Sequence, residues 1–406
     1  MAALGRPESV TATRAAVAPS AEELLQRTQN LVPSLRERAE RIAQARNMPE
    51  DVVRDLRDAQ LMELLRPRRF GGQEYALDLV YRVGRELAKG DGSTSWVYLV
   101  TSAHDVLMGL YPAAVQEEYW TSSRACGASS YSPTGEAVPA NGGFVLSGKW
   151  SFLSGVDLAG WVLLGAIVGM LENPKRPDLR YFLVPAKDYK IIDDWYVMGL
   201  RGTGSKSVVL DDVFVPDQRM LAFHDIVSGQ SPGASVSDNP IYRESGWVAI
   251  GFSLAAPATG IVQTAYEVAV AELKGRTERR DPVLEGKRPA VQMHLAEAAA
   301  LIDTSDLLYL RSFQATFARM SAGVRLTTAE RVRNRRDTCY SVLAARKAAE
   351  LLLSVGGGRG VSESHPVQRA LRDLYAIAAH PAAGWDSPAL SFGSVALGGA
   401  PTEMMI

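Results

Sequence analysis

The side chains suited to acid–base chemistry near neutral pH are few. The chain has five histidines, which are His104, His224, His294, His365 and His380. An imidazole can accept or donate a proton in catalysis, and it can also bind a metal ion. No two of these histidines have the HxxxH or HExxH spacing that places two imidazoles on one helical face. The sequence therefore predicts no metal site and leaves acid–base catalysis open.

Two of the histidines, His104 and His380, have ordinary structural explanations when each is taken singly. His104 lies in an apolar, helix-like stretch between Ser102 and Leu110, where a buried histidine with satisfied hydrogen bonds is the usual finding. His380 ends a helical pattern that begins near Pro366, where an imidazolium would interact favourably with the helix dipole. Local sequence alone favours a structural role for both.

Candidate nucleophiles and phosphate-binding loops are equally ambiguous. The sequence has no GxSxG nucleophile elbow, and Ser151 and Ser154 are residue types that also occur in turns. The glycine-rich segment 356–360 follows a helical pattern and does not join a strand to a helix. It therefore predicts a helix C-terminus, not a phosphate cradle.

Composition restricts the class of protein. The chain has 406 residues, of which 47% are apolar and 22% charged, and its formal net charge is −1. These values exclude a disordered chain and a global field that would attract nucleic acid or an anionic membrane. Cys126 and Cys339 are too few for a disulfide framework. With no run of 18 consecutive apolar residues and no secretory signal, we expect a cytoplasmic protein.

The secondary-structure pattern of the chain that must position these residues changes twice. Ser20 with Glu23, and Thr327 with Glu330, have the spacing of a capping box at the start of a helix. Helical patterns dominate to about residue 120, strand patterns from about 125 to 218, and helical patterns again through 255–274, 289–322 and 327–355. The predicted order is helices, then strands, then helices, which is an α+β protein.

Five segments in this order resemble the acyl-CoA dehydrogenase superfamily. They are Phe70-Gly71-Gly72, Gly148–Gly155, Met198–Ser205, Asp212–Pro216, and the tail with Gly356-Gly357-Gly358 and Pro366-x-x-Arg369-x-x-Arg372-Asp373. The resemblance implies an N-terminal helical domain over residues 1–124, a central β-barrel-like domain over 125–235, and a C-terminal four-helix bundle over 236–406. It also implies a flavin held between the β domain and the bundles of neighbouring subunits.

A departure from the dehydrogenases narrows the resemblance. The catalytic glutamate expected after Arg372-Asp373 is missing, and His380 stands roughly in its place. Together with Ala128–Pro133, Asp194-Trp195-x-Val197 and Gly399–Met404, this resembles the oxygenase components of two-component flavin monooxygenases, of the p-hydroxyphenylacetate or secosteroid hydroxylase type. Such an enzyme would take reduced flavin (FADH2 or FMNH2) from a separate reductase. It would use O2, through a C4a-hydroperoxyflavin, to hydroxylate an aromatic phenolic or indolic molecule, as a homotetramer or homodimer.

The resemblance also implies roles for particular residues. His104 would contact the substrate and accept its proton, Ser154 would face flavin N5, and His380 would stabilise the hydroperoxide and donate a proton. Ser129, Ser130 and Tyr131 would lie along the isoalloxazine edge, and Arg276 would reach the flavin phosphate. For Arg276 a second explanation is open, because Arg279 and Arg280 make it part of a basic run of the kind found on solvated helix faces. No metal is implied.

Three other functions stay open on the sequence. An acyl-CoA dehydrogenase or oxidase could use a displaced base, for which Glu363 and Glu403 are the available late acids. An N- or S-oxygenating relative would share the same hallmark residues. A non-catalytic scaffold could keep the fold, but loss of a hallmark residue would be expected there, and none is lost. Tightly held oxidised flavin would favour the dehydrogenase.

Overall fold

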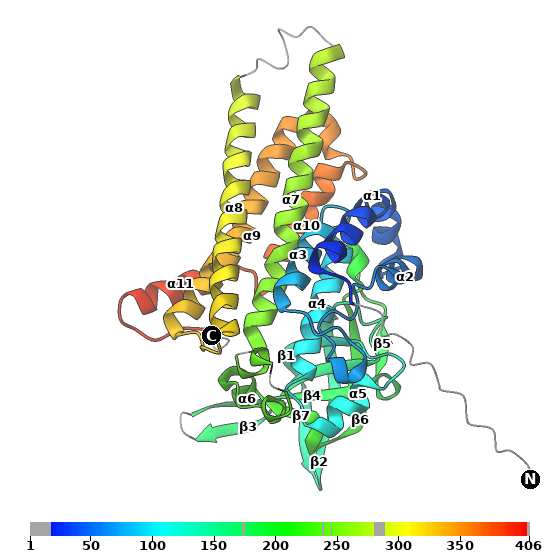
Figure 1. The fold of residues 1–406 in the computed structure, drawn as a ribbon, viewed down its shortest axis with the longest axis vertical. Helices are drawn as coiled ribbons and strands as arrows, with labels where there is room; N and C mark the ends of the chain where they lie inside the picture. The colour runs from blue at the N-terminus through cyan, green and yellow to red at the C-terminus, as the bar shows by residue number, and fades with distance from the viewer. Residues whose placement is uncertain (1–17, 173–174, 238, 245, 280–288, 404–406) are drawn as a thin grey trace, which may run out of the picture.

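The computed structural model describes residues 18–403 except 173–174, 238, 245 and 280–288. An N-terminal group of helices leads into a seven-stranded sheet, and long helices follow (Figure 1). The first helices are α1 (Ala21–Ala45), α2 (Glu50–Asp58), α3 (Leu77–Leu87), α4 (Gly92–Met108) and α5 (Ala113–Trp120). The strands are β1 (Gly127–Ala140), β2 (Gly143–Leu153), β3 (Trp161–Glu172), β4 (Lys175–Pro185), β5 (Lys190–Ile192), β6 (Lys206–Pro216) and β7 (Met220–Ala222). The remaining helices are α6 (Phe223–Ser228), α7 (Gly246–Arg279), α8 (Pro289–Ser321), α9 (Thr328–Gly356), α10 (Pro366–Ala378) and α11 (Asp386–Ala396).

Both capping boxes predicted from the sequence are confirmed. The Ser20 hydroxyl accepts a hydrogen bond from the Glu23 amide at 3.1 Å, and α1 begins at the next residue. The Thr327 hydroxyl accepts from the Glu330 amide at 3.3 Å, and α9 begins at Thr328. Each box satisfies backbone N–H groups that have no partner inside the helix, which fixes where the helix starts.

The sheet has the strand order β5-β6-β2-β1-β3-β4-β7. Its pairs are antiparallel except β1 with β3, which is parallel. Trp150 is fully buried within it, and its indole N–H donates to the Gly165 carbonyl at 2.8 Å. The register of β1 against β3 shifts between Ser130 and Gly135. A bulge of this kind redirects side chains, and it lies directly after the segment expected to meet the flavin.

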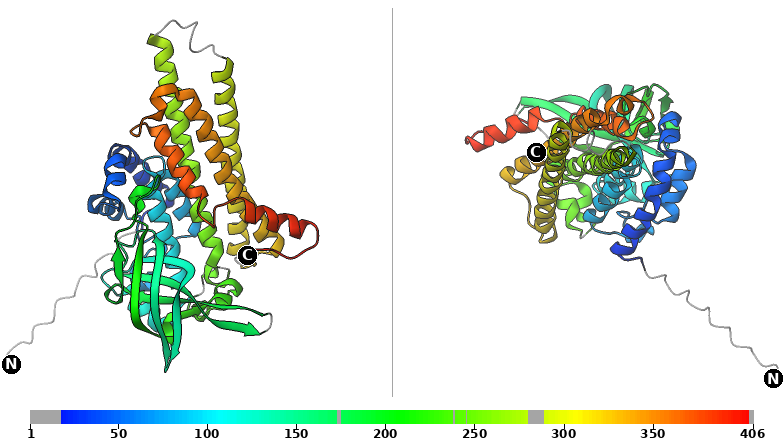
Figure 2. Two further views of the ribbon diagram at one scale, coloured as in Figure 1. Left: turned by 180° about the vertical axis from the view of Figure 1, so that it is seen from behind. Right: turned by 90° about the horizontal axis from the view of Figure 1, so that it is seen from above.

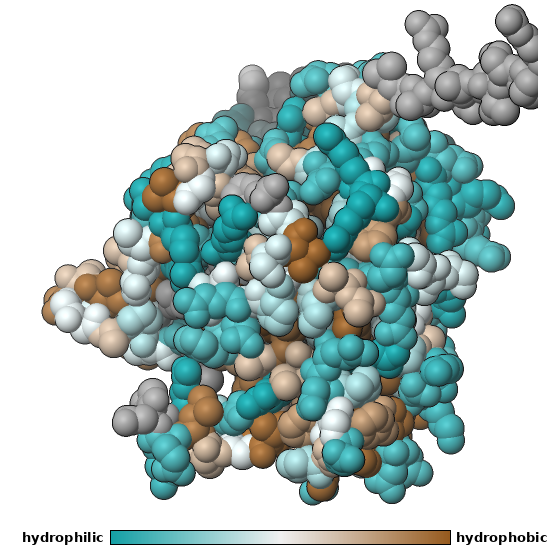
Figure 3. Space-filling model, turned by 60° about the horizontal axis from the view of Figure 1, so that its bottom comes forward, coloured by the Kyte–Doolittle hydropathy of each residue, from teal (hydrophilic) through white to brown (hydrophobic). Residues whose placement is uncertain are grey.

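The long helices run away from the sheet, and α4 lies between the two (Figures 1 and 2). Helix α7 packs against α3, α4, α9 and α10, and α4 also contacts β1. Figure 3 turns the sheet end toward the viewer and shows hydrophobic residues interspersed with hydrophilic ones on that face. Residues of α4 are therefore held between the sheet and the helices.

Helix α7 is apolar enough, by length and composition, to cross a membrane. Among the described helices it is the one that meets this test, over Gly246–Gly275. However, 76% of its apolar window is buried inside the protein. An apolar helix buried on most sides is also what the core of a large domain requires, and here α7 has that place.

Candidate active site

Helix α4 carries the first predicted site residue. The Asp91 carboxylate caps its N-terminus by accepting the Thr94 amide at 2.7 Å. Nearly every residue of α4 is buried, and His104 is 4% exposed. A helix buried on all sides holds its side chains in fixed positions, so His104 sits in a rigid, water-poor environment.

His104 is paired with a second predicted residue, Ser129 on β1. The imidazole Nε2 lies 2.7 Å from the Ser129 hydroxyl, and the buried ring also interacts with the backbone of Gly127. Burial lowers the pKa of His104 to about 4. The ring is therefore neutral at neutral pH, which is the form that can accept a proton.

Ser154 lies just beyond the end of β2, beside α4. Its hydroxyl accepts from the Trp96 indole N–H at 3.0 Å and is 2.8 Å from the Ser205 hydroxyl. The preceding Phe152 has a left-handed φ of 68°, so strand alternation does not continue through this segment. The hydroxyl of Ser151 instead lies 2.8 Å from the Ser207 hydroxyl, which donates to the Asp194 carboxylate. The two serines have separate partners because the backbone turns between them.

His380 meets the same tryptophan from the other side. Its ring packs at an angle against Trp96 with 5.7 Å between centroids. Nδ1 accepts from the Ala382 amide at 3.1 Å, so the neutral ring carries its proton on Nε2. Burial, together with the nearby Arg335, lowers the pKa of His380 to about 4. At neutral pH His380 is therefore a neutral imidazole whose Nε2–H can donate, and not the imidazolium that the end of a helix would favour.

These contacts bring the three predicted catalytic residues into one region. His104 and Trp96 are eight residues apart on α4, which is about two helical turns. Trp96 touches both Ser154 and His380, while His104 reaches Ser129. The site thus has two parts, a His104–Ser129 pair and a group of Ser154, His380 and Trp96, both built on α4.

Beside Ser129, the predicted Ser130 and Tyr131 face different surroundings. Ser130 is buried, and the Tyr131 ring packs edge-on against Trp247 at 4.8 Å and Tyr181 at 5.7 Å. The Tyr181 hydroxyl and the Trp247 indole N–H are buried without partners among the described residues. Unpaired buried donors are rare unless a ligand or water satisfies them, so this aromatic wall fits a ligand with polar groups.

The remaining predicted residues are less informative. Arg276 belongs to α7, but its side chain lies outside the described part of the structure, so its role stays a prediction. Of the two late acids, Glu363 is exposed. Glu403 is paired with Arg335 at 3.0 Å. Neither glutamate is placed as a free base.

Within the described ranges, no group of three or more His, Cys, Asp or Glu side chains could hold a metal ion.

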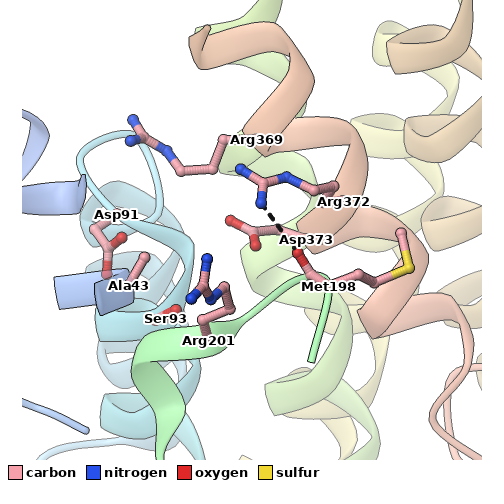
Figure 4. Close-up of a pocket in the computed structure, with 8 residues that line it drawn as sticks. All are labelled: Ala43, Asp91, Ser93, Met198, Arg201, Arg369, Arg372 and Asp373. Carbon is pink, nitrogen blue, oxygen red and sulfur yellow. Dashed lines mark hydrogen bonds between the residues drawn. The ribbon is translucent and has the colours of Figure 1, made fainter. Parts of the chain in front are cut away.

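A small pocket lined by Met198, Arg201, Arg372 and Asp373 shows how the loop that carries Thr203 and Ser205 is fixed (Figure 4). The Asp373 carboxylate accepts the Leu200 amide at 2.6 Å, and Arg372 donates to the Met198 carbonyl at 3.4 Å. Burial raises the pKa of Asp373 to about 7. Helix α10 therefore anchors the start of the Met198–Ser205 loop, and Ser205 at the end of this loop contacts Ser154.

The site fits a flavin on its own contacts. Phe152 is 72% exposed, and its carbonyl accepts from the Ser154 amide at 3.1 Å, so an exposed apolar ring and a hydroxyl come from the same turn of the backbone. A tricyclic ring with one polar edge atom needs this combination. Sequence reasoning missed Trp96, Phe152, Thr203 and Ser205. Thr203 and Ser205 lie in the Met198–Ser205 motif, so the sequence did mark their segment. No feature of the sequence marks the backbone turn at Phe152.

Comparison with known proteins shows the family to which the chain belongs. Residues 252–385 match the family model described as the acyl-CoA dehydrogenase C-terminal domain. The chain is 34% identical to the FADH(2)-dependent resorcinol hydroxylase, oxygenase component, of Rhizobium sp. (strain MTP-10005), over 92% of this chain and 94% of the relative.

Two solved structures are similar over most of the chain. The 3-HSA hydroxylase from Rhodococcus sp. RHA1 superimposes with a TM-score of 0.89 at 31% identity, over 95% of this chain and 99% of the other. XiaF from Streptomyces sp., solved in complex with FADH2 and glycerol, gives a TM-score of 0.85 at 26% identity, over 94% and 97%. The similarity therefore extends over at least 94% of this chain in both structures.

Proposed function

The chain belongs to the oxygenase components of flavin-dependent monooxygenases, within the acyl-CoA dehydrogenase superfamily, and we propose that it hydroxylates an aromatic phenolic or indolic molecule with reduced flavin and O2. The resorcinol and 3-HSA hydroxylases to which it is similar are named for hydroxylation. The observation that carries the proposal is the neutral, buried His104 beside an aromatic wall, on the same helix as the Trp96 that contacts Ser154 and His380.

Each residue has a task in this proposal. Reduced flavin, FADH2 or FMNH2, supplies the electrons that activate oxygen. Ser154 would hold flavin N5 when the flavin is bound, and His380 would offer its Nε2–H as a hydrogen-bond donor on the same side of the site. His104 accepts the proton of the substrate hydroxyl or N–H, which raises the electron density of the ring. The buried Trp96 packs against both Ser154 and His380 and excludes water from their part of the site.

The flavin contacts follow from the same placement. Ser130 and Tyr131 would line the isoalloxazine edge, and Arg276 would pair with the flavin phosphate, for which a planar charged fork is well suited. Ser129 would have two tasks, because its hydroxyl is also the partner of His104. Through that bond it orients the imidazole toward the substrate.

The finer architecture also belongs to the proposal. We infer domains over residues 1–124, 125–235 and 236–406, with a barrel-like central domain and a four-helix bundle made by α7, α8, α9 and α10. The close packing of α8 with α9, and of α7 with α9 and α10, supports the bundle. A cytoplasmic location and a separate reductase that supplies the flavin complete this account.

We expect a homo-oligomer, as a tetramer or a dimer. Helix α8 exposes Met293 and Leu307 at 69% and 67%, which are large apolar side chains for a surface without a partner. Light scattering should give a multiple of 43.9 kDa, the chain mass. A monomer that binds flavin with full affinity would contradict the idea that neighbouring subunits share the flavin site.

The proposed function is tested by supplying the flavin in two ways. With NADH and oxidised flavin alone, we expect no hydroxylated product, because the sequence has no dinucleotide-binding fingerprint. When a separate flavin reductase is added, an aromatic substrate from a panel of phenols and indoles should gain one oxygen atom. Product formed from NADH without a reductase would contradict the two-component assignment.

A further inference from the structure

A chain of hydroxyl groups leads from the interior to Ser154. The Thr203 hydroxyl donates to the Leu200 carbonyl at 2.8 Å, and it lies 2.7 Å from the Ser205 hydroxyl. Ser205 lies 2.8 Å from Ser154, which also accepts from the Trp96 indole at 3.0 Å. Thr203 and Ser205 are 1% and 5% exposed, so water does not compete for these bonds.

The ends of this chain favour one direction for the bonds in it. The Leu200 carbonyl oxygen only accepts, and the Thr203 hydroxyl at 2.8 Å is nearer to it than the Thr203 amide at 3.1 Å or the Trp195 indole N–H at 3.3 Å, so the Thr203 proton is directed to Leu200. Ser205 must then donate to Thr203, and Ser154 must donate to Ser205. An indole N–H only donates, so Trp96 takes one lone pair of the Ser154 oxygen. What remains on Ser154 is one lone pair and no free proton.

We propose that Thr203 and Ser205 are positioning residues that make Ser154 a pure hydrogen-bond acceptor and thereby select reduced over oxidised flavin. This inference rests on the proposed contact of Ser154 with flavin N5. In reduced flavin N5 carries a hydrogen and donates, so it pairs with the remaining lone pair. In oxidised flavin N5 has no hydrogen and only accepts, so it faces the Ser154 lone pair without a bond.

The loop that carries this chain is held in place independently of the flavin. The Asp373 carboxylate binds the Leu200 amide at 2.6 Å, and the Gly155 amide donates to the Thr203 carbonyl at 2.9 Å. The two bonds fix both Leu200, where the chain of hydroxyls begins, and the backbone next to Ser154. The direction of the bonds is therefore set before any ligand arrives, which is preorganisation of the acceptor.

The test measures the ratio of the dissociation constants of oxidised and reduced flavin by anaerobic titration. In Ser205→Ala and Thr203→Val the Ser154 proton is released and can turn to donate to N5 of oxidised flavin. One hydrogen bond gained by oxidised flavin should lower the ratio by roughly 3- to 10-fold. Thr203→Ser keeps the hydroxyl and should keep the ratio. Thermal unfolding verifies that each variant is folded. Thr203→Val is nearly isosteric, so it still tests the proposal if Ser205→Ala does not fold.

Two comparisons separate the possible failures. Ser154→Ala in the same titration should also change the ratio; if it does not, Ser154 does not meet N5 and that part of the proposed function fails. If Ser154→Ala changes the ratio but Ser205→Ala and Thr203→Val do not, the role of the hydroxyl chain alone is overturned. With a 5-deazaflavin, which has carbon in place of N5, the Ser205→Ala and unmodified proteins should give the same ratio. A difference there would also overturn the proposal.

Discussion

Replacement of His104 by alanine should slow hydroxylation by roughly 10²–10⁴-fold and leave the reaction of bound reduced flavin with oxygen nearly unchanged. The reason is position: His104 pairs with Ser129, whereas Ser154 and His380 meet at Trp96. Because burial lowers the pKa of His104 to about 4, the imidazole is neutral and ready to accept the substrate proton. Stopped-flow mixing with oxygen, with and without substrate, measures the two reactions separately.

The buried position of His104 calls for controls on folding. His104→Gln keeps a polar side chain of similar reach and should fold, yet it cannot accept the proton as a base. His294→Ala, on α8 with its ring near Ser354, removes a histidine outside the site and should change neither reaction. An equal loss of both reactions in His104→Ala and His104→Gln would assign His104 a structural role.

Replacement of Ser154 by alanine should release hydrogen peroxide roughly 5- to 150-fold faster, at the expense of product. The change removes the hydrogen bond to N5 in a site shielded from water, where an unpaired buried group costs about 1–3 kcal/mol. It also leaves the Trp96 indole N–H without its partner and removes one of the two hydroxyl partners of Ser205, which keeps Thr203. Product formed per flavin oxidised, together with hydrogen peroxide released, measures the effect.

Ser151→Ala is the matched control for Ser154→Ala. Both serines lie in the Gly148–Gly155 motif, but Ser151 bonds to Ser207, away from Trp96. The control should leave the yield of product and peroxide unchanged. If Ser151→Ala diverts the reaction to peroxide and Ser154→Ala does not, the assignment of Ser154 to N5 is wrong.

The order of helices and strands could be predicted because it depends on local signals. The capping boxes at Ser20 and Thr327 are short motifs whose partners are three residues away, so the chain itself specifies them. The position of α4 is different. Its residues are buried on all sides, and its sequence therefore does not say which face meets the sheet and which meets the helices.

The site was only partly predictable for the same physical reason. His104, Ser154 and His380 could be named from resemblance, but the residue that links two of them, Trp96, lies 58 positions from Ser154 and 284 from His380. Phe152 has a left-handed φ although it is not a glycine, so the sequence does not indicate the turn that places Ser154. The protonation of His380 depends on burial and on Arg335, which are properties of the fold.

The central claim is that this chain holds reduced flavin for reaction with oxygen, and an anaerobic titration of the unmodified protein tests it most directly. Flavin is added first in its oxidised form and then in its reduced form, and binding is followed by fluorescence or equilibrium dialysis. The account predicts tight binding of reduced flavin and weak binding of oxidised flavin, because in the proposed chain of hydroxyl groups Ser154 would offer N5 a lone pair and no proton. Tight binding of oxidised flavin with weak binding of reduced flavin would contradict it and would indicate a dehydrogenase.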